Sequence, residues 1–188
     1  MRLPSALLVL FALGCGQGEE PRSAPRSAAE SAPAESPEFR PIAGGVSWTA
    51  EEPLVYRRPR HELRSAEYEV REHPRALLTV SYFPPREGGG GDVQQNLDRW
   101  AGQFEGGAPE IARREINDLP VATLDVRGTF IGRLGNASRA AREDGWRMLG
   151  AVVEGERGLV FFKLIGPEDA IDLAEPAFQR LVDSIHPE

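Results

Sequence analysis

The sequence contains few of the residues that form disulfides or bind metals. Cys15 is the only cysteine among 188 residues, so the chain cannot form an internal disulfide, and zinc sites built from several cysteines are excluded. A histidine-rich metal site would need nearly all of the three histidines, His61, His73 and His186. We therefore expect no metal site and no cofactor.

Basic residues are also scarce. The chain has 22 Lys and Arg residues against 29 Asp and Glu residues, a formal net charge of -7, and Lys163 is its only lysine. Proteins that bind nucleic acids need a basic surface to neutralise phosphates. We therefore expect no nucleic-acid partner.

Long apolar segments are missing as well. The main apolar run, about Leu3 to Leu13, is shorter than the roughly 20 residues that a transmembrane helix requires. It follows Met1 and Arg2 and ends at a small residue, Gly14. This order is typical of a secretory signal peptide, which we predict for residues 1–14.

The sequence Ala12-Leu13-Gly14-Cys15 resembles the lipobox of bacterial lipoproteins, although leucine is commoner than alanine at the first position. In that family, the cysteine thiol receives a diacylglyceryl group and the signal peptide is cut just before the cysteine. The resemblance implies cleavage between Gly14 and Cys15 and a lipid, including palmitate, on Cys15. The alternative is a signal peptide that is cut elsewhere and contains a cysteine by chance.

The lipobox resemblance also implies a location in the bacterial cell envelope, on a membrane and facing the periplasm. An aspartate after the acylated cysteine would signal retention at the inner membrane in well-studied Gram-negative bacteria. Here that residue is Gly16, which favours the outer membrane.

Residues 15–42 are rich in Pro, Ser, Ala and Glu and contain almost no large apolar side chains. Such a segment cannot bury enough surface to offset the entropy lost on ordering. We predict a disordered tether over residues 15–42. A globular domain of about 146 residues, which is long enough for one core, follows at residues 43–188.

Hydrophobic periodicity predicts seven strands and two helices in this domain. Asp92 is placed to cap the first helix, Asn117 and Asp118 to turn a hairpin, and Pro176 to kink or restart the last helix. The strands are expected near residues 45–50, 63–70, 76–83, 110–116, 119–130, 146–154 and 158–165. Together they indicate an α+β fold with an antiparallel sheet of about six to seven strands covered by helices.

The element order, the tryptophan in the first strand (Trp48) and the closing "FQRLVDSI" helix resemble the Mog1/PsbP-like α/β/α sandwich. The segments "RMLGAVVE" and "FFKLIGP" are also similar to those of lipoproteins from GC-rich Gram-negative bacteria. The resemblance implies a binding or assembly module and not a catalyst. It supplies no functional residues, because no functional motif of the family matches residue by residue.

No known catalytic motif is present. The glycine run Gly88 to Gly91 lacks the lysine of a phosphate-binding loop, and Asp92 would repel a phosphate, so we expect a connector or a mobile flap. Asp125 and Arg127 lie two residues apart on one strand, where an ion pair on a solvated face is expected. We therefore expect a protein that is not an enzyme.

An arginine-rich segment, "YRRPRHELR", carries the candidate interaction residues Arg57, Arg58, Arg60 and Arg64. Such a cluster can contact an acidic partner or anionic lipid head groups. The alternative is a solvated loop without a partner.

From the sequence we expect a lipid-anchored envelope protein whose domain binds an unidentified protein or supports assembly of a complex. A small-molecule or lipid carrier is the alternative, and an enzyme comes third. A pocket lined by aromatic residues would favour the carrier, and converging titratable groups in a cleft would favour the enzyme.

Overall fold

The computed structural model describes residues 41–85, 91–133 and 141–188, all within one compact unit, Glu38–Glu188. The predicted signal peptide, Cys15, nearly all of the tether and most of the glycine run lie outside the described residues. Within the described part, no helix is long and apolar enough to cross a membrane.

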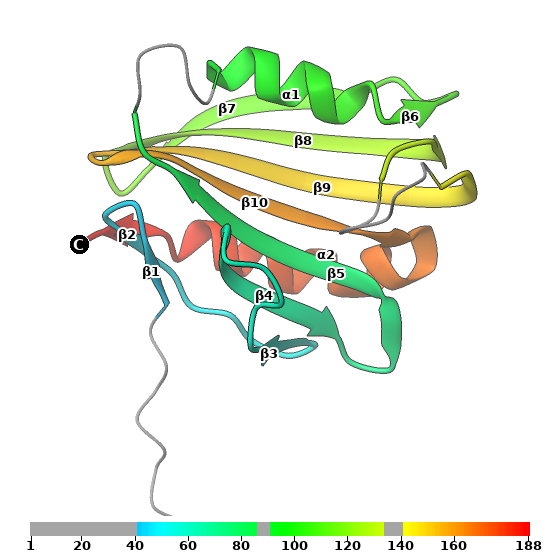
Figure 1. Ribbon diagram of the computed structural model, residues 1–188, viewed down its shortest axis with the longest axis horizontal. Helices are drawn as coiled ribbons and strands as arrows, with labels where there is room; N and C mark the ends of the chain where they lie inside the picture. The colour runs from blue at the N-terminus through cyan, green and yellow to red at the C-terminus, as the bar shows by residue number, and fades with distance from the viewer. Residues whose placement is uncertain (1–40, 86–90, 134–140) are drawn as a thin grey trace, which may run out of the picture. The chain divides into compact units, whose positions relative to one another are not determined.

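The main sheet has eight strands in the order β3-β4-β5-β10-β9-β8-β6, with β7 also paired to β8, and every pair is antiparallel (Figure 1). The four strands at its centre, β5, β10, β9 and β8, are the long ones. The bounds are β3 Leu54–Arg57, β4 Arg64–Val70, β5 His73–Phe83, β6 Phe104–Glu105, β7 Glu110–Ile116, β8 Leu119–Phe130, β9 Glu143–Gly155 and β10 Gly158–Pro167.

A small second sheet joins the beginning and the end of the domain. It contains β1 Ile42–Ala43, β2 Val46–Ser47 and β11 His186–Pro187, in the order β1-β2-β11. Trp48 follows β2 and is buried, with its indole N–H donating to the Tyr68 hydroxyl at 3.1 Å.

The two helices are α1, Val93–Ala101, and α2, Glu168–Asp183. Asp92 caps α1 as predicted, because its carboxylate accepts a hydrogen bond from the backbone N–H of Gln95 at 2.8 Å. The helix α2 continues through Pro176. Of the two predicted outcomes, a kink or a restart at this proline, the restart is therefore wrong.

Each helix packs on a different face of the main sheet, so the domain has three layers (Figure 1). We call the face that packs against α2 the back and the face that packs against α1 the front. Along β10, Phe162 and Leu164 join the core at the back, whereas Phe161 and Ile165 join the core at the front. Burying a side chain of this size contributes roughly 1.5–3 kcal/mol to the stability of the fold, so both cores stabilise the sheet.

The predicted count of six to seven strands is wrong, because the main sheet has eight strands and the small sheet three. Four strands are only two residues long and have no detectable periodicity. The segment 45–50 provides only β2, in the small sheet, and β3 occupies part of the segment that was expected to be a loop. The predicted hairpin turn is confirmed, since Asn117 and Asp118 have positive φ of 48° and 65°.

Candidate functional site

A row of polar side chains crosses the front face of the main sheet beside the part that packs against α1. The strand register pairs Arg57 of β3 with Glu67 of β4, Glu67 with Thr79 of β5, and Thr79 with Lys163 of β10. Paired residues of antiparallel strands project from the same face. These four side chains therefore form one continuous row.

Glu67 holds the first part of the row. Its side chain is fully buried, and it accepts hydrogen bonds from Arg57 Nε at 2.7 Å and from Arg64 Nη1 at 2.5 Å. Burial acts to raise the pKa of Glu67, but the hydrogen bonds and charges of Arg64 and Arg57 outweigh it and lower the pKa. The carboxylate is therefore charged at neutral pH and fixes both guanidinium groups.

Lys163 lies at the other end of the row in a different electrostatic setting. Its Nζ donates to Gln103 Oε1 at 2.7 Å, and no carboxylate of a described residue lies within 4.0 Å of it. Burial and then the positive charges of Arg99 and Arg64 lower the pKa of Lys163 to about 8. At pH 7 this side chain is mainly a partly buried cation that lacks an ion pair with any described residue.

A hollow of about 430 Å³ lies over this row. Among the described residues that line it, Glu143 is the single carboxylate, and Arg75 Nη2 donates to it at 2.7 Å. The cationic side chains of its lining are Arg57, Arg64, Arg75, Arg133 and Lys163. We call this site the basic hollow, since its lining is cationic although the whole chain is acidic.

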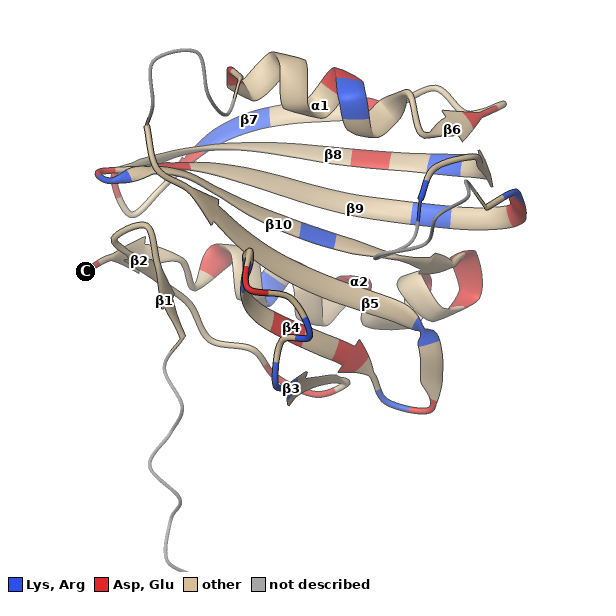
Figure 2. Cartoon of the chain, viewed as in Figure 1, with Lys and Arg blue, Asp and Glu red and all other residues tan. Residues whose placement is uncertain are grey.

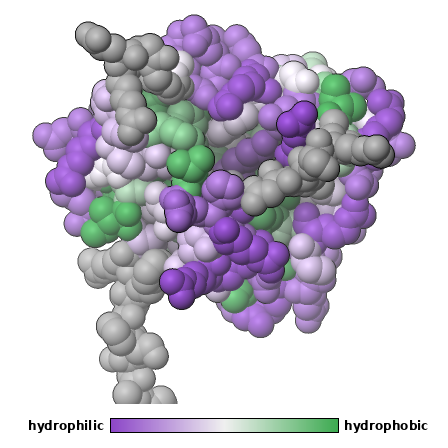
Figure 3. Space-filling view, in the orientation of Figure 1, coloured by the Kyte–Doolittle hydropathy of each residue, from purple (hydrophilic) through white to green (hydrophobic). Residues whose placement is uncertain are grey.

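Two figures show the setting of the basic hollow. Cationic residues lie in the middle of β10 and near the start of β5 (Figure 2). In the space-filling view of the same side, the surface that grey atoms leave uncovered is mostly hydrophilic, and its hydrophobic areas are separate (Figure 3). The uncovered surface on this side is therefore mainly polar.

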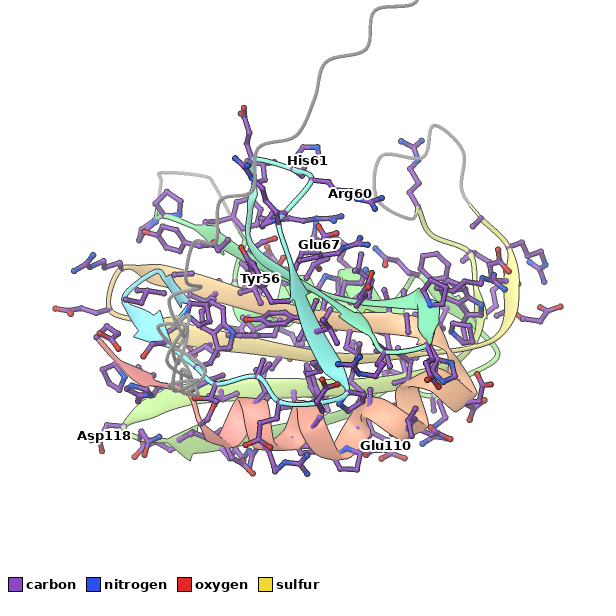
Figure 4. All side chains as sticks on the ribbon, turned by 90° about the horizontal axis from the view of Figure 1, so that it is seen from below. Tyr56, Arg60, His61, Glu67, Glu110 and Asp118 are labelled. Carbon is purple, nitrogen blue, oxygen red and sulfur yellow. The ribbon has the colours of Figure 1, made fainter. Side chains whose placement is uncertain are left out.

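The four arginines proposed from the sequence divide into two pairs. Arg57 and Arg64 are held by Glu67 and line the basic hollow, whereas Arg58 and Arg60 are exposed and have no ion pair with a described residue. Figure 4 shows Arg60 and Glu67 on the side of the sheet away from α2, whereas Glu110 and Asp118 lie on the side toward α2.

Sequence analysis missed Lys163 as a site residue. The feature that could have identified Lys163 is its charge, which stands alone in the apolar strand "GLVFFKLI". Alternation along the strand places it on the same face as Phe161 and Ile165. A lysine in the middle of a central strand is unusual because its charge must leave water.

Ser47, His186 and Glu188 form a cluster with the residue types of a hydrolase triad. The Ser47 hydroxyl donates to Glu188 Oε1 at 2.6 Å and lies 2.8 Å from His186 Nε2, while His186 Nδ1 lies 2.9 Å from the Ser184 carbonyl oxygen. In a catalytic triad, the histidine accepts the serine proton and the carboxylate orients the other ring nitrogen. Here the Glu188 carboxylate contacts the serine hydroxyl, the second ring nitrogen of His186 contacts a backbone carbonyl oxygen, and Ser47 is only 1% exposed. The arrangement links β11 to β2 and does not activate a nucleophile.

A larger hollow of about 650 Å³ lies at the other end of the sheet. Phe83, Pro85 and Leu159 supply apolar lining, and Asp92, Glu156 and Arg113 supply mixed charge. Its lining also includes Gly91, and the segment 86–90 between Pro85 and Gly91 lies outside the described residues. In the described ranges, no group of three or more His, Cys, Asp or Glu residues could hold a metal ion.

No protein-family model and no curated protein sequence matches the chain. Among solved structures, it resembles cyanobacterial PsbP (CyanoP) from Synechocystis sp. PCC 6803, with a TM-score of 0.51 and 14% identity over 77% of this chain and 88% of that chain. It is also similar to PA94, a protein of unknown function from Pseudomonas aeruginosa, with a TM-score of 0.47 and 14% identity over 72% of this chain and 97% of that chain.

The domain therefore has a PsbP-like fold, and this part of the predicted resemblance is confirmed. At 14% identity the likeness shows the fold alone, so the function must be argued from the site.

Proposed function

We propose that this chain is a lipid-anchored protein of the bacterial cell envelope whose domain is a binding module without catalytic activity. The domain binds an acidic group of a partner protein in the basic hollow. The observation that carries this proposal is the concentration of five cationic side chains around one hollow in a chain with net charge -7. Electrostatic complementarity of this kind selects partners and speeds their association.

The anchoring half of the proposal depends on Cys15. We expect Cys15→Ser to leave the chain unprocessed or to release it from the membrane fraction, because no acyl chain can then be attached. Each buried methylene contributes about 0.8 kcal/mol, and two or more acyl chains are needed for stable attachment. Labelling with radioactive palmitate and membrane fractionation measure the effect. If the wild-type protein takes up no palmitate, the lipoprotein assignment is wrong.

The binding half can be tested by site-specific photo-crosslinking in intact cells. A photoreactive amino acid in place of Leu77, which lines the basic hollow, is expected to capture one specific protein. The same residue in place of Leu173, 54% exposed on α2 at the back, is the matched control and is expected to capture none. Adding Lys163→Met to the Leu77 variant should lower the yield. Equal capture from both positions, or no capture from Leu77, would contradict the proposal.

A small-molecule carrier is the second candidate, and the larger hollow with Phe83 and Leu159 in its lining favours it. An enzyme stays third, because the Ser47 cluster lacks the geometry for nucleophilic catalysis.

A further inference from the structure

We propose that the group recognised in the basic hollow is a carboxylate with an apolar group beside it, and that Lys163 and Arg64 hold the carboxylate. This inference rests on the proposed function and names the chemistry of the group that the site accepts.

The positive charges of the hollow differ in whether an acidic group compensates them. Arg57 pairs with Glu67 and Glu69, Arg64 pairs with Glu67, and Arg75 pairs with Glu143. Lys163 instead donates to the neutral Gln103, and Arg133 has no ion pair with a described residue. Lys163 is therefore an uncompensated cation in the hollow, and the charge of Arg64 adds to the positive potential around it.

Arg64 and Lys163 both have donors that can reach an anion in the hollow. Arg64 uses Nη1 to bind Glu67, which leaves the Nε and Nη2 side of its guanidinium without a hydrogen bond to a described residue. The planar guanidinium group matches the two oxygens of a carboxylate. Lys163 can donate to the same anion from the floor of the hollow. The repulsion between Lys163 and Arg64 favours the neutral form of the lysine, and a carboxylate bound between them would reduce this repulsion.

Apolar side chains line the hollow beside these cations. Leu77 is paired in register with Ile165, two residues along each strand from the pair Thr79 and Lys163, so both lie on the same face as Lys163. Trp146 lies close by, with the Arg75 guanidinium carbon 5.3 Å from its ring centroid. These side chains can contact an apolar group beside the carboxylate. A bare phosphate would stay hydrated and would not use them.

The volume of the hollow limits the size of the group that it can bind. A hollow of about 430 Å³ lies within the range of about 300–1,000 Å³ that is usual for small-ligand sites. It can therefore take a small organic acid or the terminal residue of a protein chain. Both sources share a carboxylate on an apolar group.

The full chain, purified in detergent, offers a direct reporter because Lys163 is its only lysine. Reductive methylation with ¹³C labels Lys163 and otherwise only a free α-amino group, and it keeps the lysine charge. We expect benzoate and N-acetylleucine to shift the Lys163 methyl signal in a saturable way at pH 7. Their neutral counterparts, benzamide and N-acetylleucine amide, should not. Tighter binding of N-acetylleucine would indicate a chain terminus as the natural source, and tighter binding of benzoate a free organic acid.

Isothermal titration with the same probes tests the assigned residues. Lys163→Met should weaken binding at least about tenfold, because one of the two positive charges that bind the carboxylate is lost. The matched control is Arg113→Gln, which removes one positive charge at the larger hollow and should change the affinity less than about twofold. Wild-type affinity should also fall as the pH rises above about 8, where Lys163 loses its proton.

If neither acid binds saturably, the inference is wrong. If inorganic phosphate binds as tightly as benzoate, the inferred role of the apolar group is wrong. Either result leaves the crosslinking test of the proposed function unaffected. Failure to crosslink combined with binding of the acids would instead refute the protein-partner function and keep the inferred chemistry.

Discussion

Replacing Arg147 by leucine is expected to lower the free energy of unfolding by roughly 2–4 kcal/mol. Arg147 is only 2% exposed and lies between the main sheet and α2. Its Nε and Nη2 donate to Asp125 at 3.0 and 2.6 Å, and its Nη1 donates to Asp172 and Glu175 at 2.5 and 2.6 Å. One guanidinium thus connects β9 to β8 and to α2.

The loss follows from the three carboxylates that would remain. Burial acts to lower the pKa of Arg147, but the hydrogen bonds that Arg147 donates to Asp125 and Glu175 outweigh it and raise the pKa, so the side chain stays charged. Without it, Asp125, Asp172 and Glu175 repel one another around an apolar side chain. They are partly exposed, so water recovers some of their solvation and keeps the loss below that of a fully buried cluster.

Urea unfolding followed by circular dichroism measures this effect. Arg127→Leu is the control, because Arg127 contacts Glu168 and Asp125 in the same region but is about half exposed. We expect the control to lose less than about 1 kcal/mol. Equal losses in the two variants would show that burial of Arg147 has no special role.

Replacing Lys163 by methionine is expected to have the opposite effect and to raise the free energy of unfolding by about 1–3 kcal/mol at pH 7. The pKa of Lys163 falls from 10.5, the ordinary value, to about 8, because folding removes the ammonium group from water. Folding below pH 8 therefore carries the full penalty of burying this charge. The methionine variant avoids that penalty, although Gln103 loses its partner at a cost of about 1 kcal/mol.

The pH dependence makes this prediction specific. Between about pH 8 and 10.5 the unfolded chain binds more protons at Lys163 than the folded chain, so the stability of the wild type rises with pH. The advantage of Lys163→Met should shrink over the same interval. Urea unfolding at pH 7, 9 and 10 checks this, with Arg113→Gln as the control. A constant difference between wild type and Lys163→Met would contradict the assigned pKa.

The two variants separate stability from binding. Arg147 is a buried charge with three acidic partners, whereas Lys163 is a partly buried charge that has none among the described residues. A side chain that destabilises the folded domain is retained most easily where it serves another purpose, since sites of function often reduce stability. The expected gain in stability of Lys163→Met, together with its expected loss of binding, would fit this pattern.

The parts of the fold that were predictable from the sequence are those with strong local periodicity. The central strands, the cap at Asp92 and the turn at Asn117 and Asp118 depend on residues that are close in sequence. The strand β3 was missed because it is only four residues long and its last two residues, Tyr56 and Arg57, begin an arginine-rich segment that also contains proline. Local composition there indicated a loop, whereas pairing with β4 decides the conformation.

The candidate site was less predictable, because its residues meet only through strand pairing. Thr79 and Lys163 are 84 residues apart in the chain, and their register determines that they are neighbours. Arg57 and Arg64 were identified from the sequence, but their common partner Glu67 was not. Likewise, Asp125 was expected on a solvated face, whereas the pairing of β8 with β9 brings it to Arg147 and α2 packs over the same face.

The alternation of side chains along β10 has a consequence for how this domain can change over evolutionary time. Lys163 points to one side of the sheet, while its sequence neighbours Phe162 and Leu164 point to the other and form part of the core beneath α2. A substitution at Lys163 or Thr79 therefore alters the lining of the basic hollow and leaves the back core as it is. The charge of the hollow can thus change over evolutionary time while the scaffold stays the same.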